Sequence, residues 1–361
     1  MAAVTWRDVL LGYLAAYATV AAIAMGALIL LLIGYATNAR WLSTMRRLQE
    51  AIVGVFPLLA VLFLPIAIGV EHIYVWADLP ADLPAHDREL IATKQAWLQP
   101  AGFILRSALY LAVLIVAAEV MRRRSLRRDA VVPTGDPEAV LGRDRAIASA
   151  LLVPVGLALT FAAIDWLMSL QPTWVSSMFP VYYFAGGFVA AIALLAMLAA
   201  RYREQLGLTG HHFHALGRML FAFVVFWGYT AYFQGFLIQI ANRPTEVTFF
   251  VARTHAGWGS VLIAILLARF ALPFFLLLPR FLKYRPHYVS AIAAIVLAGH
   301  VLDMAWLVMP SRDGPLWPAI SALIVIAGAC VAFAAWRTRR VPLVAVGDPF
   351  LAKGLRYESS T

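Results

Sequence analysis

Ionisable side chains that interrupt long apolar stretches are the residues of this sequence best suited to chemistry. A charge at the centre of a membrane costs at least about 2.5–3.5 kcal/mol, so it usually faces a partner or a water-filled cavity. Carboxylates and imidazoles in such places are the usual components of proton relays. The candidates here are Asp165, Asp303, His300, Glu71, His72 and Arg106.

The composition indicates that lipid is the solvent around these residues. The chain has 361 residues, of which 63% are hydrophobic and 13% are charged, against a typical 45–50% and about 25%. A soluble fold could not hide so much apolar surface. The single cysteine, Cys330, excludes disulfides, Cys-ligated iron–sulfur clusters and a CxxCH haem attachment.

Nine apolar stretches are long enough to cross roughly 30 Å of hydrocarbon, which takes about 20 helical residues. The first is not typical of a signal peptide, because it has no basic region before it and runs into Asn38-Ala39-Arg40 instead of a cleavage site. The predicted spans are 10–35, 51–75, 99–121, 146–170, 178–200, 219–240, 255–279, 287–309 and 316–336.

The basic residues predict the orientation of these spans. Of the 29 Lys and Arg, 21 fall in the loops after the first, third, fifth and seventh spans and in the C-terminal tail. The positive-inside rule then places the N-terminus outside and the C-terminus inside. The basic run at 122–128 is interpreted as an anchor against anionic lipid, not as a nucleic-acid site.

A weak internal repeat accompanies this pattern. The fourth span ends with Asp165 just before Trp166-Leu167, and the eighth ends with Asp303 shortly before Trp306-Leu307; a proline follows each. The copies lie four spans apart, so they share an orientation. We expect an all-α polytopic fold with two four-helix transmembrane units, 1–175 and 176–310, and a final helix with a basic cytoplasmic tail, 311–361.

The helical rise places the candidates in one outer layer. Asp165 lies about 7 Å, Asp303 about 9 Å, Arg106 about 10 Å and His300 about 13 Å from the outer boundary, with Glu71 and His72 shallower. His300 and Asp303 share a helix face because they are three residues apart. Arg269 is predicted to lie apart, nearer the inner leaflet.

Two interpretations of this layer stay open. In the first, Arg106 pairs with Asp165 or Glu71, and the aspartates bond indole N–H groups to lock helices together. In the second, the carboxylates and imidazoles line a hydrated path or the headgroup pocket of a quinol. Oxidation of a quinol releases two protons, so it needs bases beside an apolar slot.

Other residues are given structural roles. His211, His212 and His214 are predicted to lie in a solvated helix entry and not in a metal site. Gly186-Gly187 indicates a close helix contact. Packing and interface positions are predicted for the aromatic residues Tyr182, Tyr183, Trp227, Tyr229 and Tyr232.

The chain resembles the F-type membrane subunits of bacterial alternative complex III, a quinol:electron-acceptor oxidoreductase. These subunits are relatives of the NrfD/polysulfide-reductase-type quinol-binding membrane proteins. The family usually has ten spans, one more than are counted here. The blocks that carry the resemblance are Gly34–Trp41, Phe56–Pro65, Leu159–Leu170, Phe179–Gly186, Leu220–Tyr229 with Gln234, and His300–Pro310.

The resemblance implies a multi-pass subunit of the bacterial inner membrane that supports quinol binding or proton transfer, with no metal, haem or other redox cofactor of its own. Its implied partners are a sister NrfD-like membrane subunit, a periplasmic iron–sulfur protein and multihaem c-type cytochromes, with a terminal oxidase as a further partner. Quinol is the implied substrate, and haem c and iron–sulfur clusters are expected in the partners. The alternatives are a stand-alone proton-coupled secondary transporter and a haem-b membrane anchor.

Overall fold

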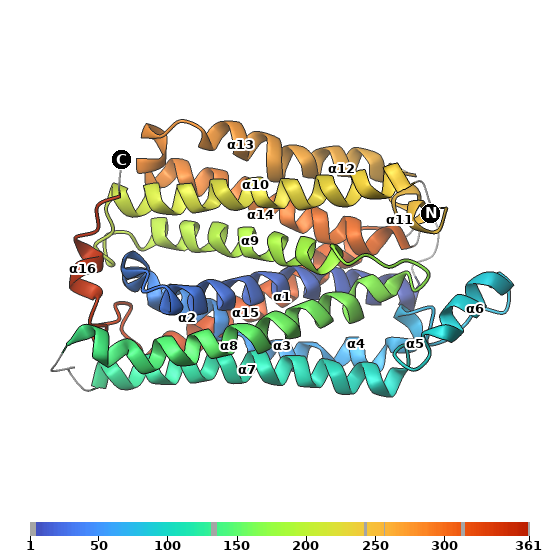
Figure 1. Ribbon diagram of the computed structural model, residues 1–361, viewed down its shortest axis with the longest axis horizontal. Coiled ribbons are helices and arrows are strands. Elements are labelled where there is room, and N and C mark those ends of the chain that lie inside the picture. Colours follow the sequence, from blue (N-terminus) through green and yellow to red (C-terminus); the bar gives the residue numbers. More distant parts are fainter. Residues whose placement is uncertain (1–4, 131–135, 242–243, 256, 312–314, 360–361) are drawn as a thin grey trace.

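The computed structural model describes residues 5–130, 136–241, 244–255, 257–311 and 315–359. All regular structure in these residues is helical. Nine helical spans among them are long and apolar enough to cross a membrane, and each overlaps a predicted one. The long helices lie side by side along the long axis of the molecule (Figure 1). The expectation of a nine-span, all-helical chain is therefore confirmed for the described residues.

The first half of the chain contains four of the nine spans. The second span is interrupted because Pro57 and Pro65 have no backbone N–H to continue an α-helix. The elements of this half are α1 (Trp6–Ala36), η1 (Arg40–Met45), α2 (Arg46–Val53), α3 (Phe56–Leu62), α4 (Leu64–Ile68), α5 (Val70–Ile73), α6 (Ala85–Thr93), α7 (Pro100–Ala130), α8 (Pro137–Trp166) and η2 (Met168–Leu170).

The second half contains the other five spans. One of them changes to a π-helix in its middle, at η3, before continuing as α13. The elements are α9 (Phe179–Arg201), α10 (Gly210–Ala241), α11 (Pro244–Ala252), α12 (Trp258–Leu266), η3 (Leu267–Ala271), α13 (Leu272–Leu277), η4 (Phe281–Tyr284), α14 (Pro286–Val308), η5 (Met309–Ser311), α15 (Trp317–Thr338) and α16 (Leu351–Leu355).

Helices α1 and α9 cross closely at the centre of the molecule. A Cβ atom added to Gly26 would lie 2.5 Å from the carbonyl oxygen of Gly187, and one added to Gly187 would lie 2.4 Å from that of Ala22. Only glycine allows two helix backbones to approach this closely. The predicted contact at Gly186-Gly187 is confirmed, and it joins the two halves of the chain.

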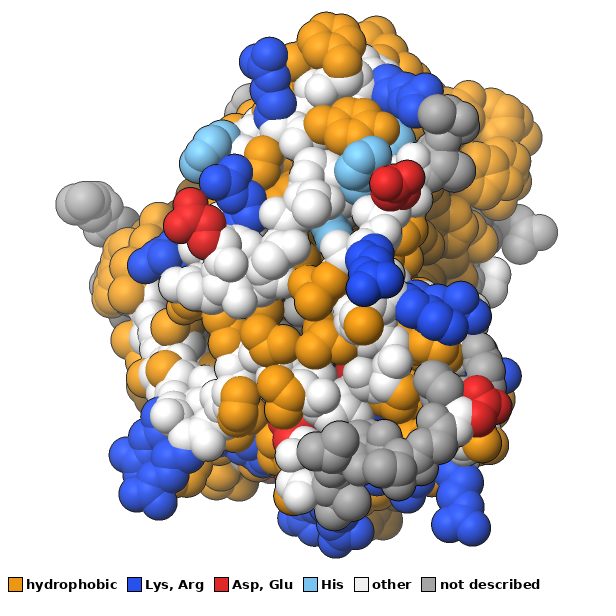
Figure 2. Space-filling view, turned by 90° about the vertical axis from the view of Figure 1, so that its left-hand side faces the viewer, with side chains coloured by type: hydrophobic (Ala, Val, Ile, Leu, Met, Phe, Trp, Pro, Cys, Tyr) orange, Lys and Arg blue, Asp and Glu red, His pale blue; other side chains and the backbone are white. Residues whose placement is uncertain are grey.

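The two ends of the helix bundle differ in character. At one end α6 projects beyond the other helices, and at the opposite end the C-terminal segment with α16 lies across the helix ends (Figure 1). We name these the α6 end and the α16 end. Figure 2 faces the α16 end and shows Lys and Arg side chains around its rim, with His side chains among them. Basic side chains therefore surround the α16 end.

Candidate functional site

A fully buried ion pair joins Asp303 of α14 to Arg269 of η3. Tyr182 of α9 donates its phenol O–H to the same carboxylate, and Nη2 of Arg269 donates to the carbonyl oxygen of Gly186 at 2.9 Å. The guanidinium carbon lies 4.4 Å from the ring centroid of Trp227. A buried charge is tolerated only when it is paired and hydrogen-bonded, and these contacts supply both conditions.

The backbone around Arg269 leaves room for its long side chain. A Cβ atom on Gly299 would lie 2.5 Å from Cγ of Arg269, and one on Gly186 would lie 3.2 Å from its Nη2. Pro273 has no N–H to bond the carbonyl of Arg269 four residues earlier, and the helix is π-helical there. The prediction that Arg269 lies apart from the other ionisable groups is wrong, because its side chain reaches Asp303.

His300 lies one turn before Asp303 on α14, and both residues are buried. Its Nε2 atom is 3.2 Å from the carbonyl oxygen of Thr19 on α1. A carbonyl only accepts, so this contact requires the proton on Nε2 and leaves Nδ1 as an acceptor. Nδ1 is buried and has no hydrogen-bond partner among the described residues. The imidazole therefore has one unused acceptor inside the protein.

A second carboxylate cluster surrounds Asp165 at the end of α8. Arg106 of α7 donates through Nε at 2.8 Å and through Nη2 at 3.2 Å. The indole of Trp97 donates at 2.7 Å and the phenol of Tyr110 at 2.9 Å. Asp165 is thus held by α7 and by the segment before it, and the predicted pairing of Arg106 with Asp165 and of an indole with an aspartate is observed.

Glu71 and His72 are not part of either cluster. They lie in α5, the short last turn of the second span, which buries Val70 and Ile73 and leaves the other two residues exposed. The helix is interrupted at Gly69 just before them. The turn that follows packs against the protein through Val70 and Ile73. Asp165, His300 and Asp303 are buried and Arg106 is partly buried, whereas Glu71 and His72 are exposed. The common depth expected for the six residues stays a prediction.

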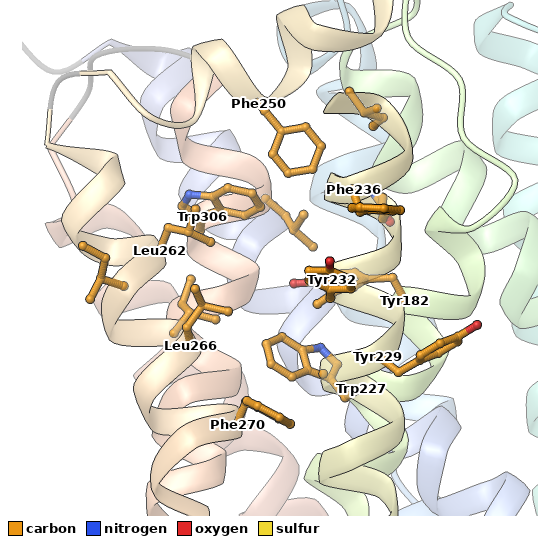
Figure 3. A pocket seen from close by; sticks show the side chains of 18 of the residues that line it. Tyr182, Trp227, Tyr229, Tyr232, Phe236, Phe250, Leu262, Leu266, Phe270 and Trp306 are labelled. Carbon is orange, nitrogen blue, oxygen red and sulfur yellow. The ribbon is translucent and has the colours of Figure 1, made fainter. Parts of the chain in front are cut away.

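An apolar cavity of about 1210 Å³ lies beside the Asp303 cluster. Tyr182 and Trp227, which both contact the cluster, form part of its wall. Figure 3 shows Trp227 and Phe270 on one side of Tyr182 and Trp306 on the other, around the space between α10 and α12. Four of the five aromatic residues predicted to hold packing and interface positions thus line a space large enough for a ring-sized ligand. They are Tyr182, Trp227, Tyr229 and Tyr232.

Sequence reasoning missed three residues of this site. Tyr182 belongs to one of the blocks that carry the resemblance, and Arg269 is the single charged residue of its span. Both could therefore have been chosen as site residues from the sequence. Gln234, which the resemblance also includes, lines the cavity and is buried. A polar amide in an apolar stretch is a weaker signal than a charge, because it costs less to bury.

The α16 end corrects the prediction for two histidines. His212 and His214 are buried, not solvated: Nε2 of His212 lies 3.0 Å from the carbonyl oxygen of Gly354, and Nδ1 of His214 lies 2.7 Å from Oγ of Ser359. In the basic run 122–128, Arg124 and Arg128 pair with Asp144. The C-terminal segment therefore covers two imidazoles that were expected to face water, and the role of the basic run as a lipid anchor stays a prediction.

Among the residues that the structure describes, no three His, Cys, Asp or Glu side chains are placed to hold a metal ion. Comparison of the chain with protein-family models and with curated proteins finds no match. The geometry of the Asp303 cluster and its cavity is accordingly the main guide to what this chain does.

Proposed function

We propose that this chain is a membrane subunit of a quinol:electron-acceptor oxidoreductase of the alternative complex III type, in the bacterial inner membrane. Nine apolar helices support a multi-pass protein, and the sequence blocks quoted above support the family. The single observation that carries the proposal is a buried carboxylate, Asp303, whose phenol donor Tyr182 forms the wall of an apolar cavity.

The two ion pairs support the proposed division into two four-helix units. Arg106 and Asp165 lie on the third and fourth spans, and Arg269 and Asp303 lie on the seventh and eighth. A repeat of four spans related by an axis along the membrane normal would produce this placement. With the basic α16 end inside, the N-terminus and the α6 end face the periplasm.

The proposed chemistry is proton transfer from a quinol. Oxidation of one quinol breaks two O–H bonds, releases two protons and passes two electrons to a redox centre of a neighbouring subunit. A hydroxyl in the cavity would give its proton towards Tyr182, whose own proton is already directed at Asp303. Haem c and iron–sulfur clusters of partner subunits would take the electrons, and this chain would hold the protons.

The test replaces one phenol in each cluster. Tyr182→Phe removes the hydrogen bond to Asp303, and Tyr110→Phe removes the matched bond to Asp165. Loss of a positioned proton-transfer group typically costs about 10²- to 10⁴-fold, so we expect Tyr182→Phe to lower quinol oxidation by the purified complex roughly 10²-fold. Tyr110→Phe should leave turnover within about twofold.

The control for assembly is copurification of both variants with the multihaem and iron–sulfur subunits. Asp303→Asn should also lower turnover, but it leaves the charge of Arg269 buried without a counter-charge and can destabilise the protein. The test therefore relies on Tyr182→Phe, which keeps the ion pair. Equal turnover in the two phenol variants, with both complexes assembled, would overturn the role of Tyr182 and Asp303. Purification of the chain alone, with no redox subunits, would overturn the assignment to an oxidoreductase.

A further inference from the structure

The basic residues at the α16 end have different surroundings in the two halves of the chain. In the first half, arginines at this end are paired with carboxylates. In the second half, residues 205–245 and 247–302 contain no Asp or Glu, so the basic side chains of α10 and η4 have no carboxylate on their own elements. The pairs of the first half are Arg46–Asp348, Arg47–Glu50, Arg47–Asp129, Arg124–Asp144 and Arg128–Asp144.

Lys283 of η4 is a buried cation of this second group, with 7% of the residue exposed. Its stem lies against α10, because a Cβ atom on Gly217 would lie 3.0 Å from its Cγ. Its Nζ lies 5.5 Å from the ring centroid of Phe221 and donates to the carbonyl oxygen of Leu277 at 2.8 Å. An ammonium has three donors, and Lys283 forms no ion pair with a described carboxylate. A buried charge therefore lacks its counter-charge here.

Two arginines lie beside Lys283. Arg218 of α10 and Arg280, just before η4, are exposed. Burial lowers the pKa of the Lys283 ammonium, and the charges of the two arginines lower it further. Arg280 forms no hydrogen bond or ion pair with a residue that the structure describes. Because three cations gathered without a carboxylate repel one another, this arrangement favours the binding of an anion.

The surface next to these cations is apolar and exposed. Phe275, Leu278 and Phe281 precede Lys283 along the chain, and they are 67%, 51% and 68% exposed. They belong to the end of a span that is apolar enough to cross a membrane, so they are placed to contact acyl chains. An anion that carries acyl chains therefore fits the cations and the adjoining surface together, whereas a soluble anion would use the cations alone.

We propose that Lys283, Arg280 and Arg218 bind the phosphate group of an anionic phospholipid whose acyl chains lie along α13 and η4. Lys283 supplies its two remaining N–H donors as a compact charge, and the guanidinium groups suit phosphate oxygens. Basic pockets between transmembrane helices at the cytoplasmic side are typical sites for anionic headgroups. This lipid site goes beyond the proposed oxidation of quinol and does not depend on it.

The experiment measures binding of a photoreactive lipid. The full chain, with any subunits that copurify with it, is solubilised in a non-ionic detergent and irradiated with phosphatidylglycerol that carries a diazirine on an acyl chain. Mass spectrometry is expected to find label in 272–285. One cation near a headgroup changes affinity about fivefold, so unlabelled phosphatidylglycerol should displace the probe at a concentration at least about fivefold lower than phosphatidylcholine. Inorganic phosphate should not displace it.

Two variants and one control assign the label to the cations. Arg280→Gln should lower the affinity for the probe about fivefold and leave folding unchanged, because the side chain is exposed. Lys283→Met should lower the affinity about tenfold or more, since a buried charge-assisted hydrogen bond is lost. Arg143→Gln replaces an exposed arginine next to Asp144 on α8 and should not change labelling of 272–285.

The outcomes separate this site from its alternatives. Unchanged labelling of 272–285 in Arg280→Gln, with the protein folded, would overturn the proposed site even where Lys283→Met fails to fold. Equal displacement by phosphatidylglycerol and phosphatidylcholine would overturn the role of the headgroup charge. Displacement by inorganic phosphate as readily as by phosphatidylglycerol would overturn the lipid as the ligand and leave a site for a soluble anion.

Discussion

The clusters at Asp165 and Asp303 use the same three groups in different surroundings. Each carboxylate is paired with an arginine and receives a phenol O–H, from Tyr110 in the first half of the chain and from Tyr182 in the second. Arg106 keeps 19% of its side chain exposed, whereas Arg269 has none exposed. The ion pair itself is therefore common to both halves, and its burial distinguishes them.

The space beside each cluster differs more sharply. Next to Asp165, the rings of Trp166, Tyr17 and Phe63 pack at centroid distances of 5.2–5.6 Å. The indole of Trp166 also donates to Oγ of Ser107 at 3.0 Å. Next to Asp303 the aromatic side chains line a cavity. The same carboxylate motif thus locks helices in one half, while in the other half it borders a space that a ligand can enter.

The largest difference should follow removal of the arginines. Arg269→Met leaves Asp303 fully buried without a counter-charge, which typically costs about 3–5 kcal/mol. Arg106→Met leaves buried Asp165 with two other donors, beside an arginine site that is partly open to the surface, so a loss of about 1.5–3 kcal/mol is expected. Thermal unfolding of the solubilised complex measures both. The paired change Arg269→Met with Asp303→Leu should recover much of the loss, and equal losses in the two single variants would contradict the comparison.

A smaller effect should follow added methyl groups. Gly299→Ala places Cβ 2.5 Å from Cγ of Arg269, and overpacking of this kind costs about 1–3 kcal/mol. Gly156→Ala on α8 meets no atom within 4 Å, so it should be neutral or stabilise the helix by up to about 1 kcal/mol. The midpoint of thermal unfolding, measured side by side, gives the comparison. A neutral Gly299→Ala would show that Arg269 is not confined as described.

The sequence predicted the parts of this structure that depend on local composition. A run of about 20 apolar residues is a local property, so all nine spans and the burial of Asp165 and Asp303 were predictable. The pairing of Arg269 with Asp303 was not predictable. Helical rise alone places the two residues at different depths, but the long side chain of Arg269, at a π-helical turn, reaches Asp303. The cavity was not predictable either, since it depends on where large side chains from several helices leave space.

The errors in the prediction have a common physical cause. Glu71 and His72 were assigned by depth alone, but depth does not determine which way a side chain points when a helix is interrupted before it. His212 and His214 were assigned to water because they begin a helix, but the C-terminal segment folds back over them. Both cases depend on contacts between segments that are far apart in the sequence or irregular in backbone.

The smallest effect is expected for Glu71→Gln combined with His72→Gln. Both side chains are exposed and lie outside the two clusters, and surface substitutions of this kind usually change stability by no more than about 0.5 kcal/mol. Quinol oxidation by the assembled complex should stay within about twofold of the unmodified complex, measured at several pH values. A fall in turnover of tenfold or more, with full assembly, would place an exit for protons at α5 and extend the functional region into the first half of the chain. Tyr110→Phe changes the Asp165 cluster and leaves Glu71 and His72 intact. Comparing it with the Glu71→Gln, His72→Gln variant therefore separates an effect of the Asp165 cluster from an effect of the surface at α5.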